Sequence, residues 1–209
     1  MKNIITIQHT QSIHHTNGMI GAWTDWDLSD LGRKQAENIG KVLKQEIDSN
    51  NYIMYSSDLK RAKQTAELVG FQLNMTPILR KEIREISAGV ETPTPVKWFN
   101  ENRTPIDEGV YDPDYKPFPN AESDKELWNR IFLFVEEMIK TEQENIIIVS
   151  HGTALSFLYS IWMNEAFASL EYKRFGSRSG GVSKLHIGTY GKRRIEILND
   201  MSYMKSQTQ

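Results

Sequence analysis

Three short runs of apolar, largely β-branched residues constrain the fold of this chain more than any other feature. They are Ile4 to Ile7, Tyr52 to Tyr55 and Ile146 to Val149. Runs of this length are typical of buried strands, and each is followed by a segment in which apolar residues recur at helical spacing. Buried strands that alternate with helices predict an α/β fold, a three-layer α/β/α sandwich around a mostly parallel sheet.

Polar residues mark where the predicted helices begin. Ser29 or Asp30 is expected to cap the helix that follows the first strand, and Ser56 to Asp58 offer capping side chains after the second strand. Ser123 and Glu126 have the spacing of a capping box, which predicts that another helix begins there.

The chain length predicts one domain, residues 1–209, that carries an insertion. Most of the prolines lie between about residues 92 and 120, beside several aromatic residues. Such a segment is typical of an irregular or partly helical cap over a site. Near the C-terminus, residues 182–187 and 193–198 flank a glycine-containing turn, which predicts a hairpin.

The composition argues against several classes of protein. The 25 basic and 27 acidic residues leave a net charge of −2, which does not favour a nucleic-acid binder. The absence of cysteine removes disulfides and thiolate catalysis and favours a reducing compartment. No apolar run approaches the roughly 20 residues that cross a bilayer, and the first residues do not resemble a secretory signal. We therefore expect a cytoplasmic protein with neither nucleic-acid nor membrane partners.

A basic side chain follows each of the three predicted strands. His9 follows the first, Arg61 the second and His151 the third. The carboxyl ends of parallel strands lie at one edge of a sheet, where ligands bind, so these side chains are expected to be neighbours. Two imidazoles, a guanidinium and nearby helix N-termini suit a phosphoryl group. The acidic stretch from Glu82 to Glu85 offers a carboxylate that can protonate a leaving oxygen.

At these residues the sequence resembles the histidine phosphatase superfamily, which has the phosphoglycerate mutase-like fold. The resemblance extends from residue 4 to about residue 190 and consists of several blocks in the family's order and spacing. The blocks are Gln8-His9-Thr10; Asp25, Leu28, Ser29, Gly32 and Gln35-Ala36; Ser56-Ser57-Asp58-Leu59 with Arg61-Ala62 and Gln64-Thr65-Ala66; Arg84-Glu85-Ile86 with Gly89; Glu122-Ser123 with Arg130; and Val149-Ser150-His151-Gly152.

The resemblance implies a two-step phosphoryl transfer that requires neither a metal nor an organic cofactor. His9 attacks phosphorus and forms a phosphohistidine, from which water or a second hydroxyl takes the phosphoryl group. Glu85 protonates the leaving oxygen and later accepts a proton from water, while His151 holds phosphate oxygens. The other residues expected to bind phosphate are Gln8, Arg61, His15 and Gly152.

The first block departs from the family pattern. Gln8 stands where the family has an arginine, so one neutral amide donor replaces a fixed charge with two donors. Loss of one donor in such a site costs a factor of about 10² to 10³ in rate. His14 or His15, if protonated, would restore part of the charge. Thr10 replaces a glycine that normally lets the backbone approach the ligand closely.

Several functions are compatible with these residues. The leading one is a phosphatase that hydrolyses a small soluble phosphate ester, so the expected partner is such an ester or inorganic phosphate. The alternatives are phosphoglycerate mutase-like transfer and a catalytically weakened phosphate-binding protein, the latter because of Gln8. A metal-dependent hydrolase using His9, His14 and His15 is disfavoured, because their spacing matches no familiar ligand motif. We expect no metal.

The cap segment is where substrate specificity is expected. Lys97, Arg103 and Lys116 lie in this segment and are candidates to meet additional negative charge on a substrate. Its aromatic residues, from Trp98 to Phe118, are candidates for stacking, although most aromatic residues in such segments serve packing.

Overall fold

The computed structural model of the chain describes residues 1–107 and 109–205. The sequence predicts a frayed end over residues 205–209, of which residues 206–209 lie outside this range. Within it the strands are β1 (Lys2–Gln8), β2 (Tyr52–Ser56), β3 (Ile78–Leu79), β4 (Asn145–Ser150), β5 (Val182–Ile187) and β6 (Arg193–Asp200). The α-helices are α1 (Asp30–Glu46), α2 (Lys60–Leu73), α3 (Val96–Asn102), α4 (Asp124–Lys140) and α5 (Gly152–Trp162).

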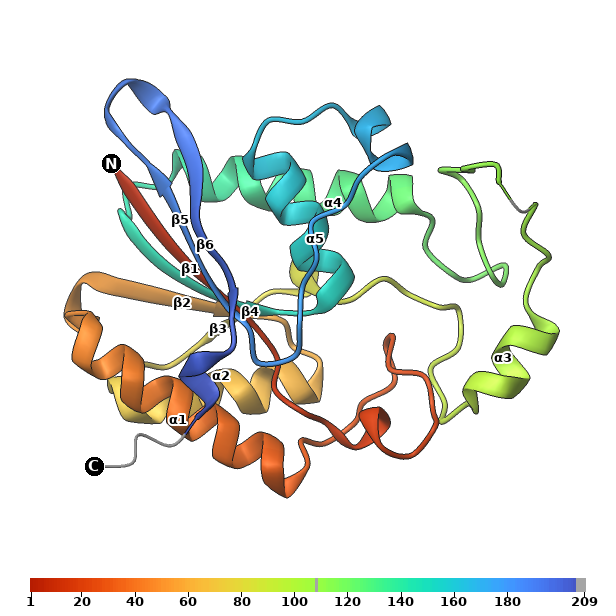
Figure 1. The fold of residues 1–209 in the computed structure, drawn as a ribbon, viewed down its shortest axis with the longest axis horizontal. Helices are drawn as coiled ribbons and strands as arrows, with labels where there is room; N and C mark the ends of the chain where they lie inside the picture. Colours follow the sequence, from red (N-terminus) through yellow and green to blue (C-terminus); the bar gives the residue numbers. More distant parts are fainter. Residues whose placement is uncertain (108, 206–209) are drawn as a thin grey trace.

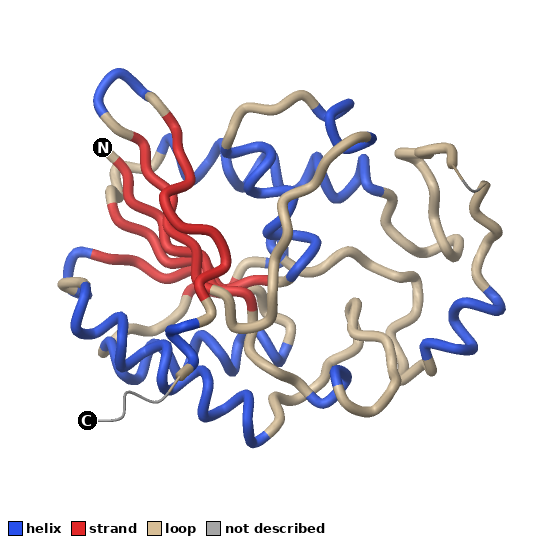
Figure 2. Tube along the Cα trace, in the orientation of Figure 1, coloured by secondary structure: helices blue, strands red, loops and turns tan. Residues whose placement is uncertain are grey.

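The strands form one mixed sheet (Figure 2). Their order in the sheet is β3-β2-β4-β1-β5-β6. β1 and β4 pair in parallel, as do β4 and β2, and β2 and β3. β5 runs antiparallel to both β1 and β6, which confirms the predicted hairpin. The crossovers from β1 to β2 and from β2 to β4 bring three segments that are distant in sequence to one edge of the sheet.

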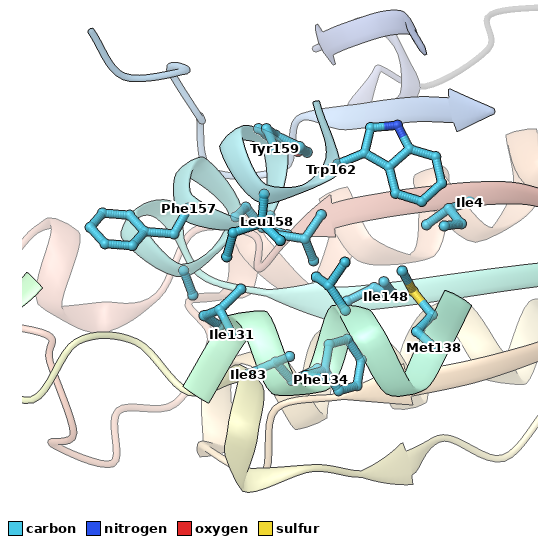
Figure 3. Close-up of a cluster of buried hydrophobic side chains, with 14 of the residues drawn as sticks. Ile4, Ile83, Ile131, Phe134, Met138, Ile148, Phe157, Leu158, Tyr159 and Trp162 are labelled. Carbon is cyan, nitrogen blue, oxygen red and sulfur yellow. The ribbon is translucent and has the colours of Figure 1, made fainter. Parts of the chain in front are cut away.

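Helices cover both faces of the sheet, with α1 and α2 on one side and α4 and α5 on the other (Figure 1). The alternation of side chains along each strand divides the core between these faces. Ile5 and Ile7 pack with Leu43 of α1 and Val69 of α2, whereas Ile4 packs with α4 and α5. Figure 3 shows the second cluster, in which Ile4 and Ile148 lie beside Phe134, Leu158 and Trp162. The predicted α/β/α arrangement is therefore confirmed.

The helix starts follow the predicted capping at two places and differ at a third. Ser29 caps α1 by accepting a hydrogen bond from the Gly32 amide at 3.0 Å. Ser123 and Glu126 form the capping box of α4. The prediction for α2 was wrong, because its N-cap is Leu59 rather than a residue of Ser56 to Asp58.

A side chain from a different loop accepts a hydrogen bond from the first turn of α2. The carboxylate of Asp25 accepts a hydrogen bond from the Lys60 amide at 2.7 Å. Asp58 instead accepts two hydrogen bonds from Arg84, at 2.6 and 2.7 Å. Tertiary contacts therefore satisfy groups that local capping satisfies elsewhere, and they attach the start of α2 to the loop that follows β1.

The segment from about residue 92 to 120 lies beyond the carboxyl edge of the sheet (Figure 1). It contains the short helix α3, and its other described residues lie in turns and irregular backbone. The Ile20 amide donates to the Thr94 carbonyl at 3.0 Å, and the Val96 amide donates to the Gly18 carbonyl at 2.9 Å. The segment is thus tied to the loop after β1.

Among the described residues, no helix has both the length and the apolar character that a membrane span requires.

Candidate active site

A cavity of about 390 Å³ lies where β1 and β4 end and α5 begins. Six of the seven predicted site residues line it, and His151 does not. The predicted residues in its wall are Gln8, His9, His15, Arg61, Glu85 and Gly152, and the others are His14, Gly21, Ala22, Thr153, Ser156, Arg174, Phe175 and Ser177. The topology therefore brings together side chains from both ends of the chain, as the sequence predicts.

His9 is buried and has its ring oriented by the backbone. Nδ1 lies 2.9 Å from the Thr10 carbonyl oxygen, which can only accept, so Nδ1 carries the proton and Nε2 keeps its lone pair. Burial, followed by the charge of Arg61, lowers the pKa of His9 well below 6.5. The ring is therefore neutral at physiological pH, which is the state a nitrogen nucleophile needs.

Arg61 supplies the fixed positive charge of the cavity. Its Nε donates to Nε2 of His9 at 3.2 Å, and its two terminal nitrogens donate to the carbonyls of Thr24 and Ala22. Burial lowers the pKa of Arg61 to about 10, which leaves the guanidinium charged at neutral pH. The backbone of Ala22 has a φ of 35°, in the left-handed region, where its carbonyl accepts from Arg61.

His151 lies behind His9, with the two ring centroids 5.1 Å apart. Its Nε2 is 2.8 Å from Oγ of Ser57, and Oγ also accepts a hydrogen bond from the Leu59 amide. If the Ser57 hydroxyl donates to Nε2, the imidazole proton lies on Nδ1. Nδ1 is buried and has no hydrogen-bond partner among the described residues. In that tautomer it is a buried donor, which is costly unless a ligand oxygen accepts from it.

The side chain of Glu85 lies at the N-terminus of α5. Its carboxylate accepts hydrogen bonds from the amides of Thr153 and Ala154, at 3.2 and 3.3 Å. The backbone of Glu85 is held separately, because its carbonyl accepts from Nε1 of Trp23 at 2.7 Å and from Arg130 at 2.9 Å. The carboxylate is thereby held in the wall of the cavity.

Gln8 is oriented by a residue from the C-terminal part of the chain. The Ser177 hydroxyl donates to Oε1 of Gln8 at 2.7 Å, so the amide nitrogen is the group left to donate into the cavity. Gly152 lies next to that nitrogen, since a Cβ placed on the glycine would be 3.5 Å away from it.

Thr10 does not obstruct the cavity. Its hydroxyl donates to the Gly32 carbonyl at 2.8 Å, and its amide donates to Oγ1 of Thr65 at 3.2 Å. The side chain that replaces the family's glycine therefore fills the space between α1 and α2.

The surroundings of His14 and His15 favour their neutral forms, which argues against the hypothesis that either ring restores positive charge. Burial, followed by the charge of His15, lowers the pKa of His14 to about 3. Burial and then Arg61 lower the pKa of His15 as well. Nδ1 of His15 accepts from the Ser12 amide at 3.2 Å, so Nε2 carries the proton. Both rings line the cavity, and His15 is suited to act there as an uncharged donor.

The low pKa of His14 predicts that acid destabilises the fold. Between pH about 3 and 6.5 the unfolded chain binds a proton at His14 that the folded chain does not, so stability falls as the pH falls below 6.5. Because the ring is partly exposed, we expect His14 to account for about 1 to 2 kcal/mol of the unfolding free energy lost between pH 7 and pH 5. Urea unfolding at both pH values should show this loss reduced in His14→Asn and retained in His186→Asn. An equal loss in His14→Asn and the parent would contradict the assignment.

His9, His14 and His15 each offer a ligand nitrogen within 4.8 Å of the others, a grouping that could hold a metal ion. Their environment favours an anion instead. Arg61 donates to Nε2 of His9, and its charge would repel a cation at that atom. Nδ1 of His15 is occupied by the Ser12 amide, which leaves that ring a donor toward the cavity.

Several residues that build the site were not predicted from the sequence. Trp23 holds the Glu85 carbonyl, Ser57 lies within hydrogen-bond distance of Nε2 of His151, and Ser177 orients Gln8. Arg174 lines the cavity as well. Ser57 and Arg130 lie inside the quoted sequence blocks, so their positions carried a signal. Trp23, Arg174 and Ser177 lie in irregular segments where no periodicity pointed to them.

These features define a class of protein. It is an α/β protein in which a neutral imidazole, a buried arginine and a carboxylate surround one cavity at the edge of the sheet, with a second buried histidine beside the first. Such a set suits phosphoryl transfer through a protein nucleophile.

The chain belongs to the histidine phosphatase superfamily, because the model of branch 1 of that family matches residues 4–201. This confirms the resemblance noted in the sequence. Phosphoserine phosphatase 1 of Hydrogenobacter thermophilus is 28% identical over 191 residues, which cover 90% of this chain and 87% of the relative. Phosphoglycerate mutase-like protein 4 of Arabidopsis thaliana is 27% identical over 216 residues, covering 97% and 86%.

Solved structures show the same fold. The mycobacterial glucosyl-3-phosphoglycerate phosphatase in complex with inorganic phosphate superposes with a TM-score of 0.76 at 19% identity, over 99% of this chain and 100% of that chain. The α-ribazole phosphatase of Shigella flexneri gives a TM-score of 0.77 at 22% identity, over 95% and 96%.

Proposed function

We propose that the protein is a phosphatase that hydrolyses a phosphomonoester through a phosphohistidine at His9. The observation that carries the proposal is the oriented, neutral ring of His9 in a cavity that also contains Arg61 and Glu85. Phosphatases among the relatives of the chain support the same conclusion. The substrate or product in the cavity is a small phosphate ester or inorganic phosphate.

The first chemical step forms a bond between Nε2 of His9 and phosphorus and breaks the ester bond. Arg61 exchanges its bond to Nε2 for a bond to a phosphate oxygen, and the amide of Gln8 and Nε2–H of His15 donate to the others. Nδ1 of His151 has no hydrogen-bond partner among the described residues, and in the tautomer that carries its proton there it would donate to a phosphate oxygen. Glu85 delivers a proton to the departing alkoxide.

The second step transfers the phosphoryl group to water. Glu85, now ionised, accepts the proton of the attacking water, and inorganic phosphate leaves as the N–P bond breaks. A mutase requires the same phosphohistidine but a site that retains a second phosphorylated hydroxyl compound in place of water. We favour hydrolysis, because the cavity has one fixed cation of its own in Arg61 and Arg174 is paired with Asp124.

The role of Glu85 gives the experiment that tests this proposal. Glu85→Gln should lower kcat for an alkyl phosphate, measured by release of inorganic phosphate, by about 10² to 10⁴, because an alkoxide needs a proton to leave. The same variant should lower kcat for p-nitrophenyl phosphate much less, because p-nitrophenolate leaves without one. Glu82→Gln is the matched control, since its carboxylate pairs with Arg80 away from the cavity. Equal losses on both esters would contradict the role of Glu85 as a proton donor.

One observation favours a second candidate function. Gln8 supplies a neutral donor where the family has an arginine, and such a site can retain phosphate binding while turnover falls. A phosphate-binding protein of this kind would bind inorganic phosphate and form no phosphohistidine. The cytoplasmic location stays a prediction from the sequence.

A further inference from the structure

A second cavity, of about 670 Å³, lies between the cap segment and the start of α4. Its wall is mostly apolar and includes Ile86, Phe99, Ile106, Val110 and Tyr115. Ile106 and Val110 are also notably exposed, at 45% and 61%. A concave surface with exposed aliphatic side chains is a typical site for an apolar ligand.

The second cavity adjoins the cavity of about 390 Å³ that His9 lines, which we call the phosphate cavity. Arg174 lines both of them. Glu85 lines the phosphate cavity, and the next residue, Ile86, lines the second cavity. If Glu85 protonates the leaving oxygen, the group attached to that oxygen extends from Glu85 toward Ile86 and the second cavity. The larger cavity is therefore placed to receive the alcohol portion of the substrate.

Three of the charged residues in the wall of the second cavity form ion pairs. Arg174 forms an ion pair with Asp124, whose carboxylate also accepts from the hydroxyl of Tyr111 at 3.0 Å. Glu122 forms an ion pair with Arg130 at 2.7 Å. These pairs leave the wall with no unpaired cation among its described residues, and Asp107 and Asp112 add further negative charge.

The basic residues of the cap segment that are candidates for substrate binding do not change the charge of the second cavity. Lys97, Arg103 and Lys116 line neither the phosphate cavity nor the second cavity. Lys116 instead pairs with Glu126 at 2.6 Å, and Lys97 lies 4.0 Å from Glu101. The expectation that these three residues meet additional negative charge was therefore wrong for these cavities. A second phosphate or carboxylate on the substrate would find acidic and apolar neighbours.

We propose that the substrate is the phosphomonoester of an alcohol with an uncharged, largely apolar group at least as large as a six-membered ring, and that this group occupies the second cavity. Esters that carry a second phosphate or a carboxylate are then poor substrates. The inference rests on the proposed phosphatase function and specifies its substrate class.

The test compares alkyl esters whose leaving alkoxides have similar basicity. The value of kcat/KM for 2-phenylethyl phosphate should exceed that for ethyl phosphate by about ten- to a hundredfold, which is the effect of burying one phenyl group. O-phosphoserine and 3-phosphoglycerate should both react more slowly than 2-phenylethyl phosphate. Ile106→Asp should reduce the ratio between the first two esters about tenfold. Leu133→Asp, on the exposed face of α4, is the matched control and should leave the ratio unchanged.

Two results would overturn the substrate class while leaving the phosphatase proposal intact. One is equal kcat/KM for ethyl and 2-phenylethyl phosphate, and the other is a preference for O-phosphoserine or 3-phosphoglycerate. If no ester releases phosphate, the phosphatase proposal itself fails. Calorimetry with 2-phenylethylphosphonate and ethylphosphonate then still tests the second cavity, because equal Kd values for the two would show that it does not bind the ring.

Discussion

His9→Ala should lower kcat for every phosphomonoester substrate by at least about 10⁴-fold, because it removes the nitrogen that bonds to phosphorus. Neither His15 nor His151 is oriented to substitute for it. Nε2 of His15 carries a proton, and Nε2 of His151 faces Ser57 rather than the cavity. The measurement is steady-state release of inorganic phosphate, together with base-quenched labelling of the protein by a radiolabelled ester. Label should be present on the parent and absent from the variant.

The matched control for this experiment is His186→Ala. His186 lies on β5 with Nδ1 2.8 Å from the side chain of Asn3, and it does not line the phosphate cavity. This variant should keep the label and the turnover of the parent. Retention of the label in His9→Ala would assign the nucleophile to another residue and refute the mechanism, whereas phosphate binding by a parent that never takes the label would favour the binding protein.

The sheet and its helices were predictable because they depend on local patterns. The run at Ile146 is apolar at every position and the run at Ile4 at every position but Thr6, so they identify strands that are buried on both faces. β3, with only two residues, has no pattern long enough to detect. The start of α2 was predicted wrongly because Asp25, which is distant in sequence, accepts the hydrogen bond that a local cap would accept.

The residues that meet at the site were predictable from the topology and from the family blocks, whereas the protonation states of its histidines were not. Strand order explains why His9, Arg61 and Gly152 meet at one edge. The neutrality of His14 depends on how far its ring is buried, and burial arises from tertiary packing. Similarly, the pairing of Lys116 with Glu126 depends on how the cap folds against α4.

Gln8 stands where the family resemblance leads us to expect an arginine, and Gln8→Glu should have a large effect. The substitution conserves shape, but the amide nitrogen that faces the phosphate cavity becomes an anionic oxygen. Loss of the donor costs about 10² to 10³ in rate, and repulsion of the phosphate dianion adds to it. We expect kcat/KM at pH 8 to fall by about 10³ or more, with part of the loss recovered at low pH as the new carboxyl group is protonated.

Gln8→Met separates the two causes, because it removes the donor without adding charge. Its kcat/KM should fall by about 10² and should show no recovery at low pH beyond that of the parent. Steady-state rates between pH 5 and pH 8, corrected for the ionisation of the substrate, provide the comparison. Since the Gln8 side chain is buried, thermal unfolding of each variant must accompany the rates. If Gln8→Met is as active as the parent, the amide contributes no transition-state hydrogen bond, and the cation of Arg61 with the donors of His15 and His151 must suffice to hold the phosphoryl group.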